Sequence, residues 1–195
     1  MSLITSVLGR TIWRCQRCED MKIPFLELAP TYRELQAELD TVLHRVLSKG
    51  RYILGEEVEA FEIEFASYLG AKHCVGVGNG LDALKLTLEA YGVGFGDEVI
   101  VPSNTYIATA LAVSQVGAKV VFVEPDSLTH NIDPGLIEAA LTTHTRAIMP
   151  VHLYGLPADM GVINDIADHH GLVVIEDSAQ AHGSLYAGKY AGTLG

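Results

Sequence analysis

Four polar segments follow short apolar runs that have the length and composition of β-strands. In an open parallel sheet, ligands bind beyond the carboxyl ends of the strands, so the residues that follow each strand are the first candidates for chemistry. We expect one binding site to form from these segments, which are Gly78-Asn79-Gly80-Leu81, Ser103-Asn104-Thr105-Tyr106, His152-Leu153-Tyr154-Gly155 and Asp177-Ser178-Ala179-Gln180.

The first of these segments has the features of a phosphate-binding turn. Its glycines let the backbone approach an anion, and the free amides and dipole of the helix that follows favour negative charge. Asn79, Gly80 and Leu81 are therefore candidate phosphate-binding residues. The alternatives are a purely structural turn and a dinucleotide site, since residues 76–80 read G-x-G-x-G. The third glycine of the dinucleotide fingerprint would fall at Leu81, however, and no acidic residue ends the next strand.

Asp177 follows the apolar stretch 172–175, which places a carboxylate at the end of a buried strand. Such a charge needs a cationic or hydrogen-bonding partner. A protonated pyridine nitrogen is one, and the carboxylate would keep the ring protonated and a better electron sink. A helix cap or a metal ligand is the alternative role. Tyr106 could stack on a flat ring or pack as ordinary core.

The elements that must position these residues alternate along the chain. We predict strands over 74–77, 99–101, 120–123, 147–151 and 172–175, and helices over 32–47, 58–69, 81–90, 106–116, 134–141 and 160–170. Strands separated by helices indicate an α/β protein with a mostly parallel sheet covered by helices on both faces. Asn104 and Asp133 are candidate helix caps, and Gly171 is a candidate helix end.

Composition excludes several classes of partner. The 195 residues include 13 Lys and Arg against 24 Asp and Glu, a net charge of −11, which disfavours nucleic acid and anionic membrane surfaces. No apolar stretch approaches the roughly 20 residues that a spanning helix needs. Three cysteines are too few for a disulfide framework, so we expect a reducing compartment and a cytoplasmic protein.

Residues 1–20 match no pattern seen later and are predicted to be an N-terminal tail, with regular organisation beginning at Met21. Cys15 and Cys18 have the spacing of half a zinc site, but no second pair follows at the distance of a zinc finger. We therefore predict no metal site.

From Met21 to Gly195 the chain resembles the DegT/DnrJ/EryC1/StrS family, the fold-type I pyridoxal-phosphate aminotransferases that act on nucleotide-linked keto sugars. The motifs that carry the resemblance occur in the family's order. They are residues 23–26 (IPFL), 50–55 (GRYILG), 79–84 (NGLDAL), 96–102 (GDEVIVP), 103–106 (SNTY), 150–155 (PVHLYG) and 176–183 (EDSAQAHG).

The resemblance implies a partial pyridoxal 5'-phosphate-binding large domain over residues 21–195. It implies that Asp177 pairs with the pyridine nitrogen, that Gln180 bonds the ring hydroxyl and that Tyr106 stacks on the ring. The amides of Gly80 and Leu81 would bind the phosphate, with Asn79 beside them. His152 and His182 would lie near the crevice.

The motif NGLDAL resembles the branch that aminates C3 of dTDP-linked 3-keto-6-deoxyhexoses. A nucleotide-linked sugar substrate, glutamate as amino donor and a homodimer are further implications of the resemblance. Two alternatives stay open: a sugar 3-dehydratase of the same family, in which histidine replaces the Schiff-base lysine, and a non-catalytic homologue.

The chain departs from the family in one respect. The Schiff-base lysine is expected beyond Gly195, and Lys189 precedes that position, so we predict that Lys189 is a surface residue. The last strands of the sheet and the C-terminal small domain would also be absent. Without that lysine, transamination loses its covalent tether and its acid/base group, so we predict negligible activity for this chain alone.

Overall fold

The computed structural model describes residues 24–195. The chain divides into two units, of which the first ends at Ile53 and the second is Leu54–Gly195. The predicted tail, residues 1–20, and its Cys15/Cys18 pair lie outside the described residues.

The described residues of the first unit form one long helix, α2 (Ala29–Lys49). It confirms the helix predicted over 32–47 and starts earlier because Pro30 fits the first turn of a helix. Gly50 ends it in the left-handed conformation, at φ 67°. The apolar stripe of the helix, Leu35, Leu39 and Leu43, is about half exposed.

The second unit begins with α3 (Glu56–Leu69), which has three acidic residues in its first turn, where the helix dipole favours negative charge. Two of its aromatic side chains contact the C-terminal part of the chain. The ring centroids of Phe65 and His182 lie 6.0 Å apart, and those of Tyr68 and Tyr190 lie 5.1 Å apart. Tyr190 belongs to a small antiparallel hairpin, β5 (Leu185–Tyr186) and β6 (Lys189–Tyr190).

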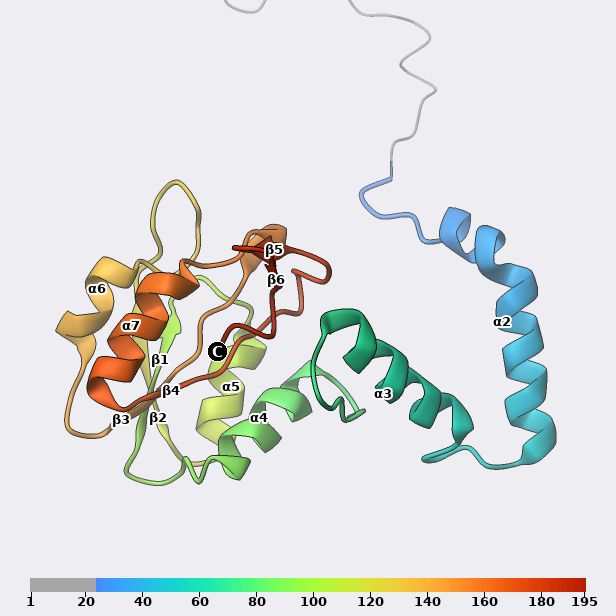
Figure 1. The fold of residues 1–195 in the computed structure, drawn as a ribbon, viewed down its shortest axis with the longest axis horizontal. Coiled ribbons are helices and arrows are strands. Elements are labelled where there is room, and N and C mark those ends of the chain that lie inside the picture. The colour runs from blue at the N-terminus through green and yellow to red at the C-terminus, as the bar shows by residue number, and fades with distance from the viewer. Residues whose placement is uncertain (1–23) are drawn as a thin grey trace, which may run out of the picture. The chain divides into compact units, whose positions relative to one another are not determined.

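A parallel sheet of four strands in the order β2-β1-β3-β4 forms the centre of the second unit (Figure 1). The strands are β1 (Glu98–Pro102), β2 (Lys119–Val123), β3 (Thr145–Ile148) and β4 (Val173–Val174). The helices α4 (Gly80–Ala90), α5 (Ile107–Gln115), α6 (Pro134–Ala140) and α7 (Met160–His170) precede or connect them. A 3-10 turn, Leu153–Gly155, follows β3.

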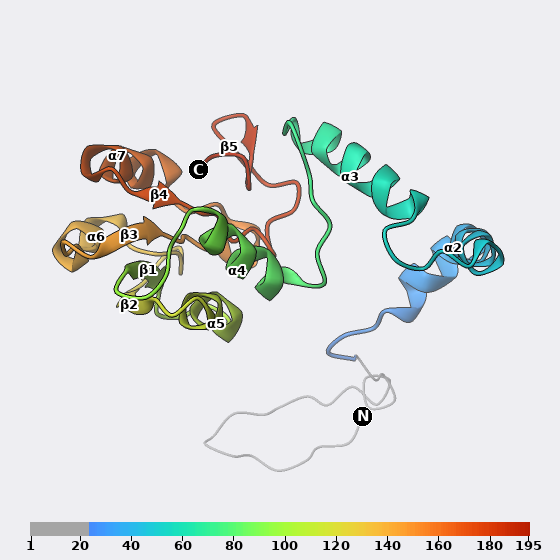
Figure 2. The ribbon, with the colours of Figure 1, turned by 90° about the horizontal axis from the view of Figure 1, so that it is seen from below.

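The helices cover both faces of this sheet, as the sequence predicted. Alternate residues of the buried strand β1 point to opposite sides, with Val99 and Val101 packed towards α4 and α5 and Ile100 packed towards α6 and α7. Figure 2 shows the two helix pairs on opposite sides of the strands. The sheet therefore separates two apolar cores.

Two local predictions were wrong. Residues 74–77 form no strand: Val75 is 75% exposed, and the backbone N–H of Gly76 donates to Glu62 Oε1 on α3 and so is not available to a strand partner. Asn104 is not a helix cap, because its side chain donates to the carbonyl of His130 and α5 starts after Tyr106 without a side-chain cap. The strands predicted over 147–151 and 172–175 do form, but with different bounds: β3 is Thr145–Ile148 and β4 is Val173–Val174.

The other predicted helix ends are confirmed. The Asp133 side chain accepts the N–H of Gly135 at the start of α6, and Gly171 ends α7 at φ 65°.

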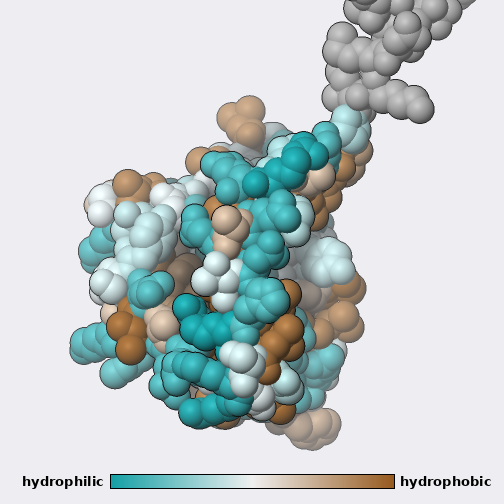
Figure 3. Space-filling model, turned by 90° about the vertical axis from the view of Figure 1, so that its right-hand side faces the viewer, coloured by the Kyte–Doolittle hydropathy of each residue, from teal (hydrophilic) through white to brown (hydrophobic). Residues whose placement is uncertain are grey.

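Hydrophobic residues are scattered among hydrophilic ones on the face seen in Figure 3. Within residues 24–195, no helix is both long and apolar enough to cross a membrane.

Candidate cofactor site at the carboxyl edge of the sheet

Backbone hydrogen bonds extend the pairing of β3 and β4 past their last strand residues. The N–H of Ile175 donates to the carbonyl of Ile148, and the N–H of Asp177 donates to the carbonyl of Pro150 at 2.9 Å. The carbonyl of Asp177 in turn accepts the N–H of His152 at 3.0 Å. These bonds fix Asp177 at the carboxyl edge of the sheet, which is where ligands bind in parallel sheets.

The carboxylate of Asp177 has two hydrogen-bond donors. The Thr109 hydroxyl donates to Oδ2 at 2.9 Å, and the backbone N–H of Ala179 donates to Oδ1 at 3.2 Å. Thr109 is fully buried on α5, and its hydroxyl lies 2.9 Å from that of Thr105. The partner that Asp177 requires is thus supplied in part by a residue that the sequence analysis did not identify.

The start of α4 is fixed by Asn79. Its Oδ1 accepts the N–H of Asp82 at 2.9 Å, while its Nδ2 donates to Asp82 Oδ2 at 3.0 Å. The N–H groups of Gly80 and Leu81 belong to the first helical turn and have no acceptor within the helix. Asn79 therefore orients two backbone donors, and its own side-chain oxygen is already engaged as a cap.

Gln180 is oriented by the 3-10 turn after β3. Its Oε1 accepts the backbone N–H of Tyr154 at 2.8 Å, so the two N–H donors of its amide stay available for another acceptor. Tyr154 has a left-handed backbone, with φ 56°, a conformation that non-glycine residues adopt at a cost. In this strained conformation of the turn, the N–H of Tyr154 is directed at Gln180 Oε1.

All six predicted binding residues line one cavity of about 440 Å³. They are Asn79, Gly80, Leu81, Tyr106, Asp177 and Gln180. Tyr106 is 73% exposed, so it lies at the surface of the cavity instead of packing in the core. The remaining lining is largely apolar, from α4, α5 and the β3 end, and includes Leu84, Leu111 and Leu153.

The chemistry of these groups fits a phosphorylated aromatic ring that contains a basic nitrogen. The paired N–H groups of a helix start suit a phosphate, and the supported carboxylate suits a protonated ring nitrogen. The free amide donors of Gln180 suit a ring oxygen, and the exposed ring of Tyr106 suits stacking.

His152 and His182 do not line this cavity. His152 is fully buried, and its Nε2 lies 2.8 Å from Oε2 of Glu176. Lys189 is an exposed residue of β6 and also lies outside the cavity lining. No group of three or more His, Cys, Asp or Glu residues in the described part of the chain is arranged to hold a metal ion.

Glu176 is a second functional candidate, besides Thr109, that the sequence analysis missed. Burial would raise the pKa of its carboxyl, but hydrogen bonds from His152 and from the backbone N–H groups of Gly192, Leu194 and Gly195 outweigh burial and lower it. The available signal was its position: Glu176 directly precedes Asp177 at the end of a buried strand, where a second charge also requires partners.

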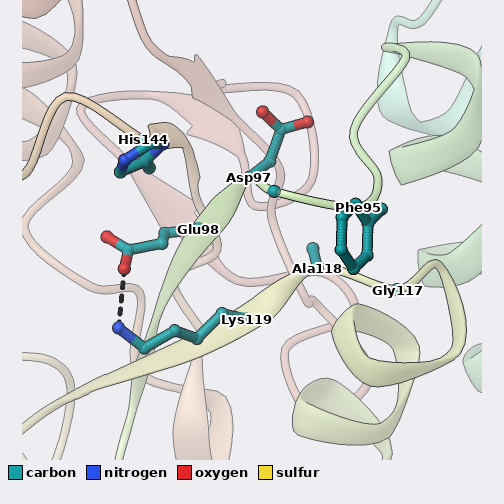
Figure 4. A pocket seen from close by; sticks show the side chains of 8 residues that line it. Phe95, Asp97, Glu98, Gly117, Ala118, Lys119 and His144 are labelled. Atoms are coloured by element: carbon teal, nitrogen blue, oxygen red, sulfur yellow. Dashed lines mark hydrogen bonds and ion pairs between the residues drawn. The ribbon is translucent and has the colours of Figure 1, made fainter.

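A second hollow, of about 270 Å³, lies at the opposite, amino end of β1 and β2 (Figure 4). Lys119 Nζ lies 2.7 Å from Glu98 Oε1 there, and hydrogen bonds from Lys119 and Thr142 lower the pKa of Glu98. None of the predicted binding residues lines this hollow. The candidate chemistry is therefore concentrated at the carboxyl edge.

The fold and this edge define an α/β protein with a candidate cofactor site beyond the carboxyl ends of its parallel strands. Residues 33–195 match the family model described as the DegT/DnrJ/EryC1/StrS aminotransferase family. The chain belongs to that family, and its partial α/β fold is similar to that of pyridoxal-phosphate-dependent aminotransferases.

Individual relatives agree with this assignment. The chain is 58% identical over 173 residues to the dTDP-3-amino-3,6-dideoxy-alpha-D-galactopyranose transaminase of Aneurinibacillus thermoaerophilus, covering 89% of this chain and 48% of that protein. It is similar to the X-ray crystal structure of S. venezuelae DesV in complex with a ketimine intermediate, with a TM-score of 0.86 and 55% identity over 87% of this chain and 46% of that one.

A third similar structure contains a bound cofactor. The crystal structure of NtdA from Bacillus subtilis with bound cofactor PMP has a TM-score of 0.81 and 40% identity, covering 87% of this chain and 39% of that one. The chain spans about half the length of the curated relatives it matches.

Proposed function

We propose that this chain provides the pyridoxal 5'-phosphate site of an aminotransferase that transfers an amino group to C3 of a dTDP-linked 3-keto-6-deoxyhexose, with glutamate as the amino donor. The observation that carries the proposal is the convergence of the six predicted residues on one cavity at the carboxyl edge of the sheet. The likeness to a dTDP-sugar transaminase supports the choice of substrate.

In this proposal the cofactor, when bound, supplies an electron sink for proton removal at the substrate carbon. Asp177 keeps a proton on the ring nitrogen. Its two oxygens accept hydrogen bonds from the Thr109 hydroxyl and the Ala179 N–H, and these bonds orient the carboxylate towards the cavity.

The other residues hold and orient the cofactor. The N–H groups of Gly80 and Leu81 bind its phosphate at the start of α4, where the helix dipole adds to the attraction. The amide N–H groups of Gln180 donate to the ring oxygen, and Tyr106 covers one face of the ring. Apolar side chains such as Leu111 exclude water from its edge.

We infer that the lysine that tethers the cofactor and moves the proton is not among the residues of this chain, and that Lys189 does not take its place. Lys189 is exposed in β6 and lies outside the cavity lining. Negligible turnover of the chain alone follows from this, while cofactor binding without a covalent bond is retained. A cytoplasmic homodimer is part of the same proposal.

The test uses pyridoxamine 5'-phosphate, which has the ring and phosphate but no aldehyde and so requires no lysine. Pyridoxamine 5'-phosphate is titrated into the full chain, and isothermal calorimetry measures its affinity. Asp177→Asn is expected to weaken binding by about tenfold or more, the scale of one lost charge-assisted bond. Asp168→Asn, which changes an exposed carboxylate on α7, is the matched control.

Two results would count against the proposal. One is equal affinity of wild type, Asp177→Asn and Asp168→Asn for pyridoxamine 5'-phosphate, which would place its binding elsewhere. The other is loss of binding in Lys189→Ala, which would show that Lys189 takes part in binding the cofactor.

A further inference from the structure

The carboxylate of Glu176 accepts four hydrogen bonds. Its Oε1 accepts the backbone N–H groups of Leu194 at 2.6 Å and Gly195 at 2.8 Å. Its Oε2 accepts the N–H of Gly192 and bonds Nε2 of His152, each at 2.8 Å. The Glu176 side chain is only 5% exposed, so these four donors replace the water that a carboxylate normally binds.

The donor role of His152 is fixed by its other ring nitrogen. Nδ1 accepts the backbone N–H of Ala158 at 3.0 Å, so the proton of the neutral ring lies on Nε2 and is directed at Glu176. His152 is fully buried. Neither the imidazole nor the carboxylate can rotate without leaving a buried donor or acceptor unpaired.

The segment 192–195 is tied to the same region by further contacts. Asn164 on α7 donates from Nδ2 to the carbonyl of Leu194 at 2.7 Å. Gly192 has φ +88°, and a Cβ there would lie 3.2 Å from Ser178 Oγ, so the backbone approaches the residue after Asp177 closely. Among the described residues, Asn164 Oδ1 and Ser178 Oγ are the buried side-chain atoms without a hydrogen-bond partner, and both side chains border this segment.

The side chains of Glu176 and Asp177 point to opposite faces of the sheet at the end of the same strand. Successive side chains of a strand alternate between faces. Ile175 packs in the core with α4 and α5, and Val174 packs in the core with α7. Asp177 accordingly meets Thr109 on α5, while Glu176 meets the segment 192–195. One peptide unit joins the two residues, so a restraint on either carboxylate also restrains the position of that peptide unit.

We propose that Glu176 is a positioning residue for the cofactor site: by anchoring residues 192–195 and His152, it fixes the strand end that directs Asp177 at the ring nitrogen, and it couples cofactor binding to the order of this segment. The proposal rests on the proposed function. The coupling acts in both directions, because any restraint on Asp177 also restrains the peptide unit that carries Glu176.

Glu176→Gln tests the role with little change in shape. The amide presents one oxygen and one NH₂ group, so in either orientation two of the four donors face another donor. We expect the amides of Gly192, Leu194 and Gly195 to exchange with deuterium at least about tenfold faster in this variant. Glu138→Gln, at an exposed position on α6, is the matched control and is expected to behave as wild type.

Three further measurements on the full chain test the coupling. Pyridoxamine 5'-phosphate is expected to slow the exchange of residues 192–195 in wild type and not in Glu176→Gln. Its affinity is expected to fall about tenfold in that variant. The ultraviolet band of the bound ring, which reports protonation of its nitrogen, is expected to shift, a change that loss of stability alone would not produce.

The outcomes are distinguishable. If Glu176→Gln loosens residues 192–195 but leaves the affinity and the ring spectrum unchanged, Glu176 anchors the segment only and the inference is overturned, while the proposed function stands. If wild type binds pyridoxamine 5'-phosphate without slowing exchange in this segment, the coupling is again refuted, and that measurement needs no variant to fold. If wild type does not bind the compound, the proposed function fails and the inference fails with it.

Discussion

Replacing Thr109 with valine removes one hydroxyl from the buried side of the candidate site and keeps the side chain's shape. Thr109 is fully buried, and its hydroxyl donates to Asp177 Oδ2 at 2.9 Å. A hydrogen bond to a charged group contributes about 1.5–3 kcal/mol, so Thr109→Val should lower the unfolding free energy by that amount. For a chain of this size the loss corresponds to a fall in Tm of about 3–12 °C.

The same substitution should weaken pyridoxamine 5'-phosphate binding by about tenfold, because Asp177 loses the donor that orients it. Thr109→Ser keeps the hydroxyl and loses one methyl group, which costs about 0.8 kcal/mol of stability and should leave the affinity unchanged. Calorimetric titration and thermal melting of both variants separate the two effects. Equal affinities of the valine and serine variants would show that the Thr109 hydroxyl does not orient Asp177, contrary to our reasoning.

Three other outcomes are expected. Asn79→Ala removes the cap of α4, which should cost about 1 kcal/mol in urea unfolding and weaken the ability of inorganic phosphate to compete for the site; unchanged competition would remove Asn79 from the phosphate argument. Because the pKa of the Glu176 carboxyl lies below its usual value of 4.5, its charged form stabilises the fold above that pH and this stability is lost as the pH falls through the lowered pKa. Acid unfolding followed by circular dichroism should therefore be less steep in Glu176→Gln, and identical profiles would contradict this assignment. Ile148→Ala empties a fully buried position and should cost about 2–5 kcal/mol, whereas Ile63→Ala, at a position 72% exposed, should cost far less; similar costs would contradict the core described for the sheet.

Much of the candidate site could be predicted because its information is local. Tyr106 and Asp177 follow strands that were predicted and that form, so recognising the alternation of elements was enough to place these two at the same edge of the sheet. Gly80 also lines the cavity, although the strand predicted before it does not form. The turn chemistry of Asp133 and Gly171 is equally local and was also predicted correctly.

The errors and omissions concern groups whose partners lie far along the chain. Asn104 has a cap-forming side chain, but that side chain bonds the carbonyl of His130, 26 residues away, instead of a helix start. The segment 74–77 has strand composition, but the N–H of Gly76 is bonded to Glu62. Thr109 lies 68 residues from Asp177, so no spacing in the sequence indicates that they pair.

The alternation of Glu176 and Asp177 between two faces of the sheet has a consequence for insertions and deletions. Loss of one residue from the stretch 172–175 would rotate the strand end by half a period and send each carboxylate to the other's side. Asp177 would then face the backbone of 192–195, and Glu176 would face Thr109 and the cavity. We therefore expect natural variation in this stretch to proceed by substitution at constant length.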